Sequence, residues 1–192
     1  MLPSRLLRFA LVALAVIAVA CGDPTRPKAT YSNSLSSYTL YALTGTAATV
    51  PNAVSFLGGP TRASSTFGFD LAFDIDAAGR VQIYPVRTLA GSLAGGVKRV
   101  GLLPISGGFE SIREVPERGY DTLSIQTVAP RTVLAVQILD TQACISSFYS
   151  QLLYAKLVID SIDVPNRRLY IRSVTDLNCG YRMVNPDTVP TN

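Results

Sequence analysis

Few residues in this chain can carry chemistry, because the 192-residue sequence contains no histidine and no tryptophan. Without histidine, Ser-His-Asp and Cys-His nucleophilic catalysis is excluded, as are metal sites built on imidazole. No phosphate-binding glycine loop and no dinucleotide-binding fingerprint occurs either. The remaining candidates are carboxylates, cationic side chains and three cysteines, Cys21, Cys144 and Cys179.

Three carboxylates, Asp70, Asp74 and Asp76, alternate with apolar residues in one stretch. Residues 74–79 partly match a calcium loop, but Ala78 lacks a ligand oxygen and Pro85 stands where the bidentate Glu belongs. Paired carboxylates could also serve glycoside hydrolysis. The alternation instead favours acids on the wet face of a strand that runs into a hairpin turn. The sequence therefore predicts no metal site and no cofactor.

Basic residues gather at Arg167, Arg168 and Arg172, with Lys98 and Arg99 elsewhere. Such clusters usually solvate a surface, and the functional alternative is a site for an anionic partner such as lipid head groups or acidic glycans. Tyrosines near the C-terminus offer a similar choice between a binding patch and packing at sheet edges. These tyrosines are Tyr149, Tyr154, Tyr170 and Tyr181.

The N-terminal segment has the pattern of an export signal. Arg5 and Arg8 precede residues 9–20, which contain no charged or strongly polar side chain. That run is shorter than the roughly 20 residues that span a bilayer, and it fits the hydrophobic region of a signal peptide. It ends in Ala18-Val19-Ala20-Cys21. Here the chain resembles the bacterial lipoprotein class, in which a small-residue box precedes an invariant, lipidated cysteine.

The resemblance implies that residues 1–20 are a signal peptide and that Cys21 carries a diacylglyceryl group and an N-acyl chain. Several acyl chains hold a protein stably on a membrane, whereas one chain does so only marginally. Gly22 rather than Asp follows Cys21, which favours the outer membrane over the inner membrane. The alternatives are an ordinary cleaved signal peptide, with Cys21 incidental, and a signal anchor.

If Cys21 is lipidated, Cys144 and Cys179 remain as an even pair in an exported chain, where disulfides persist. They are then expected to form one disulfide, the alternative being two buried thiols. Without Arg5 and Arg8, 15 basic residues face 13 acidic ones, which is not the charge signature of a nucleic-acid-binding protein.

The rest of the chain is expected to fold as strands. Residues 21–37, rich in Pro, Ser and Thr, are predicted to be a flexible tether. Residues 38–192 show short apolar stretches separated by turn signals and no sustained helical period, which predicts a single antiparallel β-sandwich, or a barrel-like domain, of about 7–9 strands. The expected strands are 38–44, 52–57, 67–76, 80–86, 97–105, 121–128, 131–139, 152–163 and 168–174, with 109–115 as a further candidate.

Two of these strands allow detailed predictions. In residues 67–76 the odd positions should enter the core and Asp70, Asp74 and Asp76 should face water. In the last hairpin, odd positions should oppose odd ones, with Ser161 opposite Ile171 and residues 165–167 as the loop. Cys144 and Cys179 would then both lie beyond the open end of that hairpin, where a bond could close it.

The sequence thus predicts a lipid-anchored protein of the bacterial cell envelope with a non-catalytic domain for binding or scaffolding. Its partners would be the membrane, through Cys21, and an unidentified envelope protein or glycan, with no nucleic acid. The alternatives are a subunit of an envelope assembly and a carboxylate-based hydrolase acting on glycans.

Overall fold

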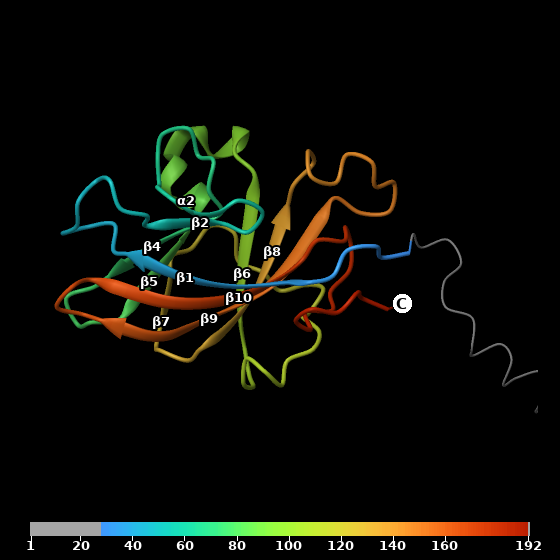
Figure 1. The fold of residues 1–192 in the computed structure, drawn as a ribbon. Helices are drawn as coiled ribbons and strands as arrows, with labels where there is room; N and C mark the ends of the chain where they lie inside the picture. The colour runs from blue at the N-terminus through green and yellow to red at the C-terminus, as the bar shows by residue number, and fades with distance from the viewer. Residues whose placement is uncertain (1–27, 192) are drawn as a thin grey trace, which may run out of the picture. The chain divides into compact units, whose positions relative to one another are not determined.

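Ten strands among the described residues, 28–191, build two antiparallel five-stranded sheets in the computed structural model (Figure 1). The first sheet contains, in spatial order, β1 (Ser34–Tyr41), β10 (Arg168–Asp176), β9 (Leu152–Asp163), β8 (Val133–Leu139) and β6 (Arg99–Ile105). The second contains β3 (Gly59–Thr61), β2 (Ala53–Ser55), β4 (Leu71–Ile75), β5 (Val81–Pro85) and β7 (Gln126–Val128). A short helix α2 (Val86–Ala90) and the 3-10 helix η1 (Gly91–Gly96) connect β5 to β6.

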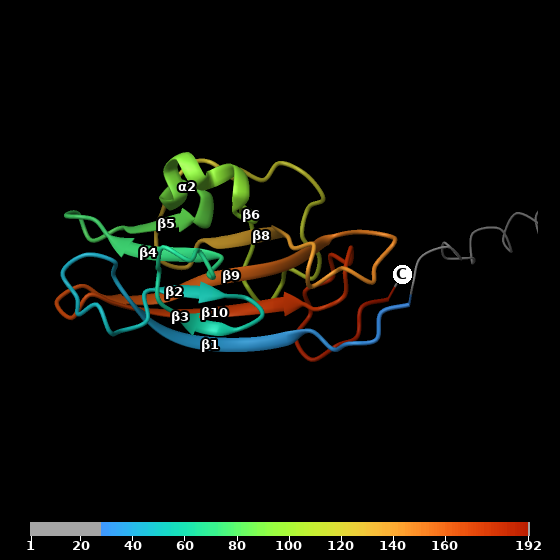
Figure 2. The ribbon, with the colours of Figure 1, turned by 90° about the horizontal axis from the view of Figure 1, so that it is seen from above.

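The predicted all-β sandwich is confirmed, as two sheets stacked face to face rather than one closed sheet (Figure 2). The ten strands exceed the expected 7–9, and the strand that the sequence did not predict is β3, a three-residue segment that follows directly on the turn after β2. β6 lies at a sheet edge, as Pro104 within it predicts, since proline cannot donate a hydrogen bond to a further strand.

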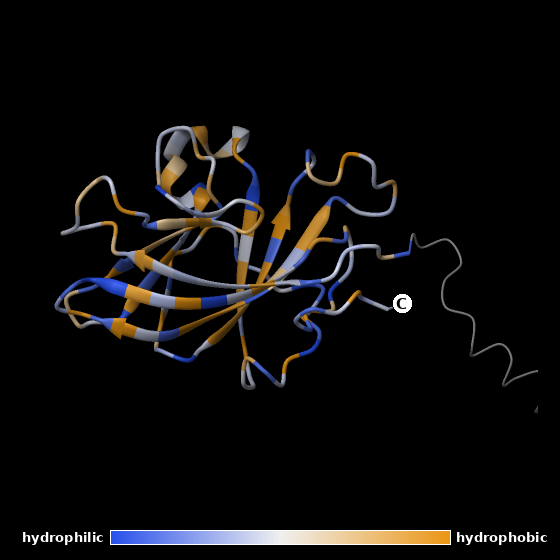
Figure 3. Ribbon diagram, in the orientation of Figure 1, coloured by the Kyte–Doolittle hydropathy of each residue, from blue (hydrophilic) through white to orange (hydrophobic). Residues whose placement is uncertain are grey.

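The main core lies between the sheets and follows the alternation of each strand. Odd residues of β9 and even residues of β8 enter it, together with Leu71, Phe73 and Ile75 of β4. The hydrophobic bands along the strands show this alternation in Figure 3. The apolar residues from β8 and β9 are Leu134, Val136, Ile138, Leu153, Ala155, Leu157 and Ile159.

The opposite face of the first sheet is also covered, by irregular segments that follow β6 and β10. Phe109, Val115 and Val184 from these segments pack against Tyr154 and Val158 of β9. The prediction of a strand at residues 109–115 is therefore wrong, since only Glu114 forms a β-bridge there, with Met183. This stretch covers apolar surface instead of extending a sheet.

The predicted tether, residues 21–37, is corrected at its C-terminal end. Strand β1 starts at Ser34, and the side-chain amide of Asn33 donates from Nδ2 to the carbonyl oxygens of Met183 (2.7 Å) and Asn185 (2.9 Å). The compact unit that contains both sheets spans Ala29–Pro190, so residues 29–37 belong to the folded domain. Residues 21–27 and residues 1–20, the predicted signal peptide, lie outside the described residues.

The predicted wet face of residues 67–76 is wrong. The strand covers only 71–75, all five of its residues are buried, and Asp70 and Asp74 are 1% and 7% exposed. Phe67 lies before the strand with a positive φ of 51° and is only half-buried. Burial of these two acids is tolerated because each forms an ion pair with a basic residue from a distant part of the chain, Lys98 for Asp70 and Arg167 for Asp74.

The last hairpin pairs odd with odd residues along most of its length, but its predicted register is wrong. Ile171 lies opposite Ile159 rather than Ser161, and Ser161 lies opposite Tyr170. The register shifts between these pairs because Asp160 is an extra residue on β9, which is the geometry of a β-bulge. The loop therefore contains residues 164–167 between Asp163 and Arg168.

Among the described residues, no helix has the length and apolar character needed to cross a bilayer.

We predict that Phe69→Ala lowers the free energy of unfolding by about 3–5 kcal/mol, because it removes a large side chain from a filled core. Phe69 is 1% exposed, whereas Phe148 is fully exposed on a loop. Phe148→Ala is therefore the matched control and should change stability by less than about 0.5 kcal/mol. Urea unfolding of both variants measures the difference, and equal losses would contradict the assignment of Phe69 to the core.

Candidate functional site

A cleft of about 550 Å³ opens where α2, η1 and the start of β6 meet the end of β8. Three cationic side chains line it: Arg87 from α2, Lys98 just before β6, and Arg99, the first residue of β6. Its other walls are Thr66, Phe67, Gly68, Gly95, Gly96, Val97, Leu139, Asp140, Thr141 and Gln142. The cleft thus combines positive charge, polar groups and one aromatic ring.

Lys98 is held at the cleft by the buried Asp70. Its Nζ lies 2.5 Å from Asp70 Oδ1, and the other carboxylate oxygen accepts a 2.7 Å hydrogen bond from Phe56 N–H. The Lys98 side chain is 25% exposed, so its charge is partly neutralised and partly presented to solvent. A buried carboxylate must be paired in this way, because an isolated one would cost several kcal/mol.

Arg87 is held in place by hydrogen bonds to Val97, the residue that follows η1. Its Nε and one terminal nitrogen both donate to Val97 O, at 3.1 and 3.0 Å. A guanidinium carries five donors, so this pair of bonds orients the group and leaves donors for a ligand. Because the Arg87 side chain is already held in one position, binding a ligand there costs less side-chain conformational entropy.

The single carboxylate of the cleft wall is engaged locally. Asp140 Oδ1 accepts hydrogen bonds from the N–H groups of Gln142 (3.1 Å) and Ala143 (3.0 Å), which caps the turn after β8. Exposed Arg99 carries its charge beside that turn. Lys98 is paired with Asp70, and Asp140 is the one acid of the lining, so Arg87 and Arg99 still leave the lining net positive, which suits an anionic ligand.

A second hollow, of about 490 Å³, lies over the outer face of the first sheet and contains two acids, Glu110 and Asp160. Both bind Arg172: Asp160 through two hydrogen bonds of 2.7 and 2.9 Å, and Glu110 through one of 2.6 Å. These bonds, Asp160 first, raise the pKa of Arg172. The guanidinium lies between the two carboxylates, so this arrangement is an ion triad rather than a free acid and base.

Lys156 lies beneath this second hollow and is 0% exposed. Its Nζ donates to Phe109 O (2.6 Å) and Ile112 O (2.7 Å) and lies 4.6 Å from the centre of the Phe109 ring. Burial lowers the pKa of this ammonium group. Glu110 opposes that shift through its charge, while Arg113 and Arg172 add to it.

The predicted arginine cluster does not exist as one surface. Arg167 crosses to the other sheet, where it binds Asp74 Oδ1 (2.8 Å) and Thr44 O (2.6 Å). Arg168 lies over the ring of Tyr41, at 5.5 Å from its centre, while Arg172 forms the triad above. Three neighbours in sequence therefore serve three separate structural contacts.

The tyrosines also do not share one role. Tyr154 and Tyr181 are buried, whereas Tyr149 and Tyr170 are 47% and 39% exposed. The partial calcium loop is a hairpin turn, in which Asp76 Oδ1 accepts from the N–H groups of Ala78 and Arg80. Among the described residues, no three Cys, Asp or Glu side chains approach closely enough to hold a metal ion.

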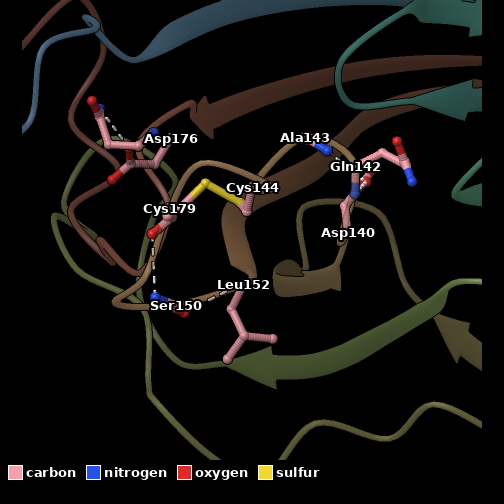
Figure 4. Close-up of a disulfide and its surroundings, with 10 residues drawn as sticks. Asp140, Gln142, Ala143, Cys144, Ser150, Leu152, Asp176 and Cys179 are labelled. Carbon is pink, nitrogen blue, oxygen red and sulfur yellow. Dashed lines mark hydrogen bonds between the residues drawn. A yellow bond between two sulfur atoms is a disulfide. The ribbon is translucent and has the colours of Figure 1, made fainter.

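The predicted disulfide between Cys144 and Cys179 is confirmed, with Cα atoms 5.9 Å apart (Figure 4). It lies beyond the open end of the β9–β10 hairpin, as expected, because Cys144 precedes β9 and Cys179 follows β10. Gly180 N–H donates to Leu152 O (2.7 Å) beside it. Cys21, the predicted lipidation site, lies outside the described residues.

Sequence reasoning found Lys98 and Arg99 but not Arg87 or Phe67. A five-residue helix leaves too little periodicity to detect, and Phe67 looked like a core position of a strand. The signal available in the sequence is a glycine-rich run, 91–96, placed between two basic positions.

No protein-family model, no curated protein and no solved structure matches this chain.

We predict that Lys156 makes stability increase with pH below 10.5. The group has a lower pKa folded than unfolded, so between the two values the unfolded chain binds one more proton, and raising the pH favours folding. Lys156→Met removes this contribution. Urea unfolding of both proteins across alkaline pH should give curves whose difference grows with pH, with wild type gaining relative to the variant. Parallel curves would show that Lys156 titrates as it does in the unfolded chain.

Proposed function

We propose that this is an exported, lipid-anchored protein of the bacterial envelope whose β-sandwich binds a small anionic ligand without catalysis. The observation that carries the proposal is the convergence of Arg87, Lys98 and Arg99 on one cleft of about 550 Å³. Ligand sites commonly have this size and a few placed polar groups.

The ligand class follows from the lining. Guanidinium groups bind carboxylates and phosphates through charge-assisted hydrogen bonds. Thr66, Thr141 and Gln142 offer hydroxyl and amide groups, and the ring of Phe67 offers an apolar face. An acidic sugar combines all three needs, because it carries an anion, hydroxyl groups and a flat C–H face.

The contacts favour binding over hydrolysis. A carboxylate-based hydrolase needs one protonated acid and one free base near the scissile bond. Glu110 and Asp160 instead share Arg172, and the only acid lining the basic cleft, Asp140, caps a turn. The sequence contains no histidine to replace them.

The anchor and the location rest on the Ala18-Val19-Ala20-Cys21 motif and on the disulfide. A Cys144–Cys179 bond is expected in an oxidising compartment outside the cytosol, which agrees with export. Lipidation of Cys21 would hold the domain at the membrane, with the outer membrane favoured by Gly22.

We predict that Arg99→Glu weakens binding of glucuronate by about tenfold or more, since it replaces a charge-assisted hydrogen bond by like-charge repulsion. Arg118→Glu is the matched control, because it makes the same charge change at a side chain that is 89% exposed and outside the cleft. NMR titration with glucuronate, glucose 6-phosphate and glucose measures both affinity and the preferred anion. Equal losses in both variants, or equal binding of glucose, would contradict a specific anion site.

We predict that Cys21→Ser moves the protein from the membrane to the soluble fraction or leaves uncleaved precursor, because serine cannot form the thioether. Cell fractionation and mass spectrometry of the N-terminus measure this. Membrane attachment that persists in the variant, with processing at another residue, would rule out the lipid anchor.

A further inference from the structure

The loop between β8 and β9 presents large apolar side chains to solvent. Ile145 is 74% exposed, Phe148 106% and Tyr149 47%, all within five residues. Single exposed apolar residues are ordinary on protein surfaces, but three on one loop tip indicate a contact surface. Residues 141–151 contain no charged side chain, so the tip is apolar and neutral.

The base of this loop is firmly held. Cys144, 1% exposed, is bonded to Cys179, and its N–H donates to Asp140 O at 3.2 Å. The Ser147 N–H donates to Cys144 O (2.9 Å). Tyr149 packs against Gly180, where an added Cβ would lie only 3.0 Å from its ring. The fold therefore presents the tip in a set position, which lowers the entropy cost of inserting it elsewhere.

The loop lies at the end of the domain where the chain enters from its N-terminus. The N–H groups of Thr30 and Tyr31 donate to Asn178 Oδ1 at 2.9 and 3.0 Å, and Asn178 directly precedes Cys179. Figures 1 and 2 both show the first described residues (blue) and the loop (orange) at the same end. The entry point of the chain is thus joined to the loop through Asn178, Cys179 and Cys144.

The length of the preceding chain limits how far this end can be from a lipid on Cys21. Ala29 follows Cys21 by eight residues, which span at most about 28 Å when fully extended. A tether this short keeps the end that carries Ile145, Phe148 and Tyr149 close to any bilayer that holds Cys21.

We infer that the loop tip, residues 145–149, inserts into the interfacial region of the bilayer to which Cys21 is anchored, as a second membrane contact. Phenylalanine, tyrosine and isoleucine flanked by uncharged Ser and Gln suit that region, where aromatic side chains concentrate. Since the tip lacks cations, insertion depends on apolar burial and is insensitive to anionic lipid. This inference rests on the proposed lipid anchor.

The absence of tryptophan from the chain allows a direct test. Phe148→Trp places the single tryptophan of the chain at the tip, and Leu123→Trp places it at a 71% exposed position in the segment between β6 and β7, with excitation that selects tryptophan over tyrosine. Full-length lipidated variants are reconstituted in phosphatidylcholine vesicles with and without lipids brominated in the acyl chain. We expect a blue-shifted emission for Phe148→Trp and a several-fold larger quenched fraction than for Leu123→Trp, unchanged when anionic lipid is added.

Equal quenching of the two variants would overturn the inference. Protection of the Phe148→Trp fluorophore in native membranes but not in pure lipid vesicles would also overturn it, by assigning the loop to a protein partner. Failure of the anchor has a separate signature, because neither variant would then remain with the vesicles on sedimentation. As a further check on intact folding, Ile145→Ser combined with Phe148→Ser should leave thermal unfolding unchanged and abolish lipid protection of the loop amides in hydrogen exchange.

Discussion

The complete burial of β4 is the constraint from which much of the architecture follows. Burial places Asp70 and Asp74 in the interior, and a buried carboxylate is tolerated only with a cation and hydrogen-bond donors around it. Lys98 supplies the first cation from the start of β6, and Arg167 supplies the second from the tip of the β9–β10 hairpin. Each pair joins elements of different sheets, so these contacts fix how the sheets stack and place Lys98 at the cleft.

Because both faces of the first sheet are covered, the ammonium group of Lys156 is buried, and burying a charge is unfavourable without partners. Its strand alternates regularly, with apolar odd residues between the sheets and Tyr154 and Val158 on the opposite face. An ammonium in that second layer would be unfavourable without partners, and the irregular 109–112 segment offers two carbonyl oxygens and a ring face. The segment predicted as a strand is irregular because its backbone serves this lysine instead of a neighbouring strand.

Sequence patterns within a short stretch of the chain predicted the features that depend on interactions between near neighbours in sequence. Alternation and turn residues predicted the sandwich class and the limits of β9. The Cys144–Cys179 bond was expected because these two cysteines remain as a pair once Cys21 is set aside. The burial of Asp74 could not be predicted, because its partner Arg167 lies 93 residues away and nothing in the intervening sequence marks the pairing. The bulge at Asp160 could not be predicted either, because alternation shows which residues share a face of the sheet but does not reveal an extra residue inside a strand. For the cleft, sequence alone identified two of three cations.

Along the chain, Cys144 of the Cys144–Cys179 disulfide lies between the loop tip proposed to contact a membrane and a wall of the basic cleft proposed to bind a ligand. Residues 139–142 form one wall of the basic cleft, and the same turn begins the loop that carries Phe148. Cys144 ties that loop to Cys179, whose neighbour Asn178 binds the first described residues of the chain. The Cys144–Cys179 bond therefore ties the connection that contains both the cleft wall and the loop tip to the residues that follow β10.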